Sequence, residues 1–68
     1  MAPWRNLGGR IRKARLKRGL TQPALATRAG ISRIYVAKLE AGERESPSLA
    51  VLDRIAKALG VSLLDLLK

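Results

Sequence analysis

The sequence contains no cysteine and no histidine, and it has only one tryptophan and one tyrosine. Without cysteine no disulfide framework can form. Without cysteine or histidine the chain also lacks the thiolate and the imidazole on which most zinc sites and nucleophilic or acid–base catalysis depend. We therefore expect no metal site, no cofactor and no enzymatic activity.

Long hydrophobic runs are also absent. No run exceeds four residues, the length of Leu49 to Leu52, whereas a membrane-spanning helix needs about 20. The first six residues contain no apolar block of a signal peptide, so a soluble, cytoplasmic protein is expected. At 68 residues the chain should form one domain, 1–68 with a core of about 5–67. A domain this small buries only about 60% of its unfolded surface, which favours a partner that completes its core.

Acidic residues are missing from more than half of the chain. Residues 1–39 carry ten Lys or Arg and no acid, whereas residues 40–68 carry four Lys or Arg and all five acids, so charges of +10 and −1 give the net +9. A field of one sign attracts polyanions, and nucleic acid is the abundant polyanion of the cytoplasm. The alternative, a basic surface kept for solubility, usually has interspersed acids.

Apolar periodicity predicts an all-α fold of five short helices, because no stretch alternates as a strand would. Glycines follow the first four helices, and Thr or Ser precedes the last four as a cap. Only Ile31 separates Gly30 from Ser32, so a tight turn joins the second and third helices. The expected helices cover about residues 6–18, 22–29, 33–41, 49–59 and 63–67.

One motif spans that turn. It reads Thr21-Gln22-x-x-Leu25-Ala26-x-x-Ala29-Gly30-Ile31-Ser32-x-x-x-Val36-x-x-Leu39-Glu40-x-Gly42, and a second pattern, Pro47-Ser48-Leu49-x-x-Leu52-x-x-Ile55-Ala56-x-Ala58-Leu59-Gly60-Val61-Ser62, follows it. Together they resemble the Cro/repressor-type (XRE-like) helix-turn-helix DNA-binding family over roughly residues 5–67. The resemblance implies a compact, five-helix, lambda-repressor-like domain whose second and third helices form the helix-turn-helix.

The third helix has an outward stripe that suits the major groove of DNA. If Val36 and Leu39 face the core, the helical spacing turns Arg33, Ile34, Ala37 and Lys38 outward. Alanine permits close approach, Arg and Lys can reach guanine O6 and N7, and isoleucine suits a thymine methyl. We expect these four residues to contact bases. The alternatives are a solvated face for Arg33 and Lys38, and packing near the turn for Ile34.

Phosphate contacts are expected around this stripe. The resemblance assigns Gln22 to the DNA backbone, and a helix N-terminus favours anions there. Tyr35 can donate its hydroxyl to a phosphate or simply cover the edge of the core. Loop contacts are weakened by Glu43 and Glu45, whose charges repel phosphates. The remaining candidates for phosphate contact are Arg44, Ser46 and Ser48.

Two further sets of residues have structural roles to play. The resemblance pairs Arg15 with Glu40, and a partly buried ion pair of this kind would fix the approach of the third helix. The last helix carries more leucine than one inward face can use, which favours a homodimer, although all of its leucines could pack within one chain. The expected interface residues are Leu63, Leu66 and Leu67, with Leu64 beside them.

These observations predict a sequence-specific duplex-DNA-binding transcriptional regulator, most simply a repressor. It would read a palindromic operator as a homodimer, with half-sites about 34 Å apart. No membrane partner and no small-molecule ligand is expected. The alternative is an antitoxin or adaptor-type protein-interaction module on the same fold. A non-specific basic peptide that coats RNA or a membrane fits the charge but not the caps and the core periodicity.

Overall fold

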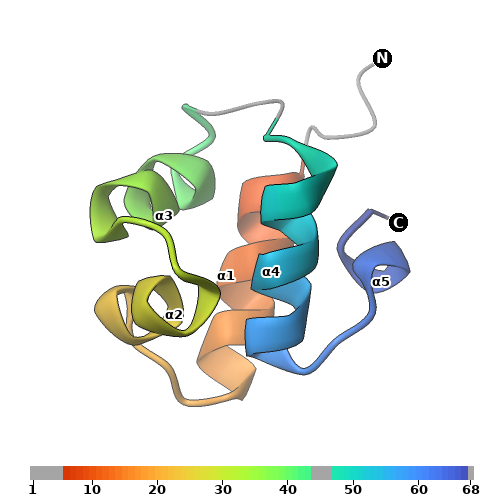
Figure 1. The fold of residues 1–68 in the computed structure, drawn as a ribbon, viewed down its shortest axis with the longest axis horizontal. Helices are drawn as coiled ribbons and strands as arrows, with labels where there is room; N and C mark the ends of the chain where they lie inside the picture. Colours follow the sequence, from red (N-terminus) through yellow and green to blue (C-terminus); the bar gives the residue numbers. More distant parts are fainter. Residues whose placement is uncertain (1–5, 44–46, 68) are drawn as a thin grey trace.

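The computed structural model describes residues 6–43 and 47–67, which form five α-helices and no strand. Helices α2 and α3 lie on one side of α4, and α5 lies on the other side (Figure 1). The predicted all-α, five-helix fold is confirmed. The helices are α1 (Leu7–Lys17), α2 (Gln22–Ala29), α3 (Arg33–Glu40), α4 (Leu49–Leu59) and α5 (Leu63–Leu67).

Side-chain caps set where most of these helices begin. The hydroxyls of Thr21, Ser32 and Ser48 each accept a hydrogen bond from the backbone N–H three residues later, at 3.0–3.2 Å. At the start of α5 the Asp65 N–H donates to Ser62 Oγ at 3.1 Å, and the Ser62 N–H donates to Asp65 Oδ2 at 3.3 Å. This is a capping box with the shorter acid, as the sequence predicts. The caps satisfy backbone donors that have no partner within the helix.

The turn between α2 and α3 consists of Gly30, Ile31 and Ser32. Gly30 has a φ of 70°, a left-handed conformation that residues with a Cβ rarely adopt. The Ile31 N–H donates to the Ala26 carbonyl at 3.0 Å and closes α2, and Ser32 then caps α3. The turn therefore fixes the N-terminal end of α3 relative to α2.

All five helices contribute side chains to one hydrophobic core. Leu66 of α5 belongs to this core and is only 3% exposed. This corrects its expected place in a dimer interface, because its side chain is already covered within the chain. Leu49 at the start of α4 is 60% exposed. At about 100° per residue it points toward the edge of the face that Leu52 and Ile55 bury.

Helix α1 packs against two different helices, α3 and α5. On the α3 side the contact is very close, because a Cβ added at Gly8 would overlap the Leu39 carbonyl oxygen and lie 3.0 Å from the Glu40 carbonyl oxygen. Only a residue without a side chain permits this approach. The C-terminal end of α3 therefore lies against α1.

Candidate nucleic-acid interface

The outer face of α3 is open to solvent along its length. Val36 and Leu39 are buried and hold the inner face to the core. Arg33 and Lys38 are exposed, and Ile34 is 64% exposed. Ile34 therefore does not pack beneath the turn, and the face is not covered by residues 6–43 or 47–67.

All four residues expected to contact bases line one hollow of about 570 Å³ between α3 and the start of α2. The long side chains of Arg33 and Lys38 border the small Ala37, which is the arrangement that lets a helix approach the edges of bases closely. Gln22 from α2 lines the same hollow. The structure thus brings a predicted phosphate contact next to the predicted base contacts.

An acid also lines this hollow. Glu43 follows the end of α3, and its N–H donates to the Lys38 carbonyl oxygen at 2.9 Å. Glu43 therefore lines the hollow together with Arg33 and Lys38. Its charge opposes the approach of phosphates there.

Arg15 and Glu40 form a buried, bidentate ion pair between α1 and α3. Arg15 Nε donates to Glu40 Oε2 at 2.6 Å, and Arg15 Nη2 donates to Glu40 Oε1 at 2.9 Å. The two side chains are 10% and 4% exposed. Arg15 Nη1 also donates to the Leu20 carbonyl oxygen at 2.8 Å. The pair therefore connects α1, the end of α3 and the segment before α2.

The hydrogen bond to Glu40 raises the pKa of Arg15 above its ordinary value, although burial acts in the opposite direction. Like other arginine side chains in proteins, the guanidinium is charged. Gln22 joins the pair, because its Nε2 donates to Glu40 Oε1 at 3.2 Å. An amide nitrogen carries two hydrogens, so Gln22 keeps one donor for a phosphate. Its predicted contact with the DNA backbone stays a prediction.

The other predicted phosphate contacts are differently placed. Ser48 Oγ accepts the cap hydrogen bond from Val51, and its own hydrogen can still be donated to a phosphate. Tyr35 is partly buried against the core, which agrees with its alternative role at the core edge. Arg44 and Ser46 lie outside the described residues.

Arg12 of α1 also borders this surface. It is exposed and lines a smaller hollow of about 270 Å³ together with Gln22 and Ala37. The helical spacing carried a signal, because Arg12 lies three residues before Arg15 and shares its flank of α1. Arg12 therefore borders the same surface as the outer face of α3.

No group of three or more carboxylates in residues 6–43 and 47–67 could hold a metal ion. None of their helices is long and apolar enough to cross a membrane.

Comparison with known proteins shows which family this chain belongs to. A family model for the helix-turn-helix matches residues 11–66. The chain belongs to the helix-turn-helix family. An immunity repressor protein of Bacillus phage phi105 is 46% identical to it over 55 residues, which are 81% of this chain and 38% of that repressor. The chain thus spans well under half the length of this relative.

Two solved structures of this helix-turn-helix type are similar over nearly their whole length. The restriction-modification controller protein C.AhdI from Aeromonas hydrophila has a TM-score of 0.88 and 35% identity, covering 97% of this chain and 98% of that one. SinR, a master regulator for biofilm formation solved in complex with DNA, has a TM-score of 0.89 and 31% identity, covering 91% and 98%. The predicted Cro/repressor-type family is confirmed, and the chain carries the DNA-binding domain of its transcriptional regulators.

Proposed function

We propose that the protein is a sequence-specific transcriptional regulator, most simply a repressor, that binds a palindromic operator in cytoplasmic DNA as a homodimer. It acts by binding rather than by catalysis. Helix α3 enters the major groove, where Arg33 and Lys38 donate to guanine and Ile34 contacts a thymine methyl. A bound repressor of this kind would occlude a promoter.

One observation carries the proposal, namely the exposed outer face of α3. Arg33, Ile34 and Lys38 protrude around the small Ala37, and all four line one hollow. Gln22 and Arg12 border that surface from α2 and α1, where their side chains could contact phosphates. The likeness to SinR, which was solved in complex with DNA, supports the same use of this face.

The dimer is proposed through α5. Leu64 is 70% exposed, and Leu63 and Leu67 are partly buried against the core. A leucine this exposed on a five-residue helix favours contact with a second copy. Two α3 helices related by a two-fold axis would then read half-sites about 34 Å apart.

Selection of duplexes from a random pool tests the DNA proposal, and a palindrome is the expected product. On the selected duplex, Arg33→Ala should cost about 1–3 kcal/mol and relax the preference at one base pair. Arg12→Ala should weaken binding to all sequences alike and make the salt slope shallower by about 0.9. Equal losses on selected and random duplexes for Arg33→Ala would reject the assignment of α3.

Sedimentation of the Leu64→Asp variant tests the dimer. The mass should fall from that of a dimer to that of a monomer, while far-UV circular dichroism stays unchanged because Leu64 is exposed. Leu66 is unsuitable for this test, since an acid at a core position would unfold the chain. A dimer that persists in Leu64→Asp contradicts the α5 interface but leaves DNA reading by α3 intact.

A further inference from the structure

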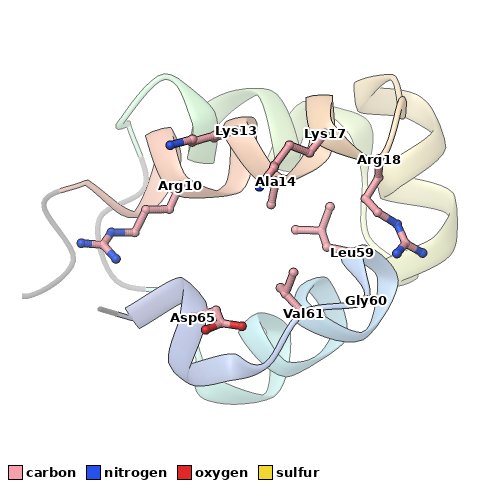
Figure 2. Close-up of a pocket in the computed structure, with 9 residues that line it drawn as sticks. All are labelled: Arg10, Lys13, Ala14, Lys17, Arg18, Leu59, Gly60, Val61 and Asp65. Atoms are coloured by element: carbon pink, nitrogen blue, oxygen red, sulfur yellow. The ribbon is translucent and has the colours of Figure 1, made fainter.

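A second groove lies between α1 and the α4–α5 connection, and we call it the α1–α5 groove. It has a volume of about 450 Å³. Its α1 rim carries Arg10, Lys13 and Lys17, with Arg18 at the end of that helix, and Asp65 lies on the α5 side. Figure 2 shows Arg10 and Arg18 toward opposite ends of the groove. The rim is therefore strongly cationic along its length.

Most of this charge is not neutralised within the described part of the chain. Arg10, Lys13 and Lys17 make no ion pair with any residue in 6–43 or 47–67, and the two lysines are exposed. Arg18 is engaged differently, because its Nη1 lies 2.7 Å from where a Cβ of Gly60 would be. Its guanidinium covers the C-terminal end of α4, where the helix dipole favours a cation. Three cations, those of Arg10, Lys13 and Lys17, thus remain for a ligand.

The floor of the groove is apolar. Ala14, Leu59 and Val61 line it, and Figure 2 shows Leu59 and Val61 pointing into the space beneath α1. Leu59 is fully buried, so the apolar surface that a ligand can contact is that of Ala14 and Val61, which are partly exposed. A ligand that fits this groove combines negative charge with an aliphatic surface.

The α1–α5 groove is distinct from the proposed DNA surface. Gly8, Arg12 and Arg15 share the flank of α1 that faces α3. Arg10 and Lys17 project from the other flank, toward α5. None of the residues that line the groove also lines the hollow of α3. DNA reading by α3 therefore gives no account of these cations.

The spacing of the cations indicates the shape of the ligand. Arg10, Lys13 and Lys17 recur at i, i+3 and i+7, which extends over about 10 Å of helix. A compact single anion cannot contact all three at that separation. A helix lying along α1 with carboxylates at the same spacing can do so, and its aliphatic side chains would then face the apolar floor.

Two other occupants fit less well. A second copy of this chain has only five acids, and two of them, Glu40 and Asp53, are already paired. Single-stranded nucleic acid gains much of its affinity by stacking bases on aromatic side chains, and no aromatic residue lines this groove. Charge complementarity and the aliphatic floor together favour an acidic protein segment.

We propose that the α1–α5 groove binds an acidic amphipathic helix of a partner protein, with carboxylates on Arg10, Lys13 and Lys17 and aliphatic side chains on Ala14 and Val61. The proposal is independent of how α3 reads DNA. Such a partner could bind the protein while α3 occupies a duplex. Binding of the partner would then control the activity of a regulator that has no ligand-binding domain within residues 6–43 and 47–67.

A labelled synthetic peptide tests this proposal on the intact protein. The probe is a fluorescein-labelled amphipathic peptide of Glu, Leu and Ala, with Glu at i, i+3 and i+7 and Leu on the adjoining face. Fluorescence anisotropy should show salt-sensitive binding. The charge reversal Lys13→Glu/Lys17→Glu should weaken it by about tenfold or more. Val61→Ser should weaken it several-fold without changing the salt dependence.

The matched control is Arg33→Glu/Lys38→Glu, which changes the net charge equally on the α3 face. It should leave peptide affinity nearly unchanged, and circular dichroism should show that both double variants fold. Equal losses in both double variants would overturn the proposal, because net charge alone would then explain binding. Equal affinity for a scrambled peptide, or no binding of the probe, would overturn it too. Preferential binding of a single-stranded DNA 12-mer in the groove would assign the site to nucleic acid instead.

Discussion

The close approach of α1 to α3 makes a sharp prediction for the two adjacent glycines of α1. In Gly8→Ala, the new methyl group would overlap the Leu39 carbonyl oxygen and lie 3.0 Å from the Glu40 carbonyl oxygen. Both neighbours are backbone atoms of α3, so neither can rotate away. The Leu39 oxygen also accepts a hydrogen bond from the Gly42 N–H at 3.1 Å. Relief therefore requires α1 and the end of α3 to separate.

The change in the free energy of unfolding of Gly8→Ala results from two opposing effects. Overpacking of this kind costs about 1–3 kcal/mol, whereas alanine in place of glycine within a helix contributes up to about 1 kcal/mol. Gly8→Ala should therefore lower the free energy of unfolding by up to about 2 kcal/mol. At Gly9 an added Cβ meets nothing within 4 Å, so Gly9→Ala should raise it by up to about 1 kcal/mol. The difference between the two variants isolates the steric effect.

Urea and thermal unfolding followed by circular dichroism measure both variants. For a domain of this size, about 1 kcal/mol shifts Tm by about 4–8 °C, so the two Tm values should move in opposite directions. Gly8→Ala should also bind the selected duplex more weakly than Gly9→Ala, because it displaces α3. Equal stabilisation by both alanines would refute the reasoning, since α1 would then not be held against α3 at Gly8.

Other variants test the ion pair, the acid of the hollow and the core. Glu40→Gln should lower the free energy of unfolding in urea by about 3 kcal/mol, because it leaves the Arg15 charge buried without a partner. Adding Arg15→Met should recover much of that loss. No recovery would mean that the unpaired charge is not the cause. Glu43→Gln should tighten binding to the selected duplex by about fivefold in anisotropy, since it removes a repulsion of about 1 kcal/mol; weaker binding would instead indicate that Glu43 contacts a base. Leu66→Ala should lower the free energy of unfolding in urea by about 2–5 kcal/mol at every protein concentration. A loss that depends on protein concentration would instead indicate that Leu66 lies in a dimer interface.

Helix positions followed from the sequence because their signals are local. A hydroxyl cap and a left-handed glycine act within one turn, and α3 was expected at about 33–41 and is observed at Arg33–Glu40. In the last helix, local signals do not predict which leucines are buried. Its five residues make little more than one turn, so periodicity cannot separate the inward leucine from the outward one. Only the tertiary packing assigns Leu66 to the core and Leu64 to the surface.

The same distinction holds for the candidate site. The outward stripe of α3 follows from helical spacing, once Val36 and Leu39 are taken as buried. The hydrogen bond from Gln22 to Glu40 and the place of Glu43 in the hollow depend on how α2, α3 and the following turn meet. Those relations join residues on separate elements, so no spacing within one helix encodes them.

The orientation of α3 is set at both of its ends. The turn at Gly30 fixes the start of α3 against α2, while Gly8 and the Arg15–Glu40 pair fix its end against α1. Residues outside the outer face of α3 therefore determine where Arg33 and its neighbours point. A change in the outer stripe should alter which base is read, whereas a change at these anchors should alter affinity for every sequence.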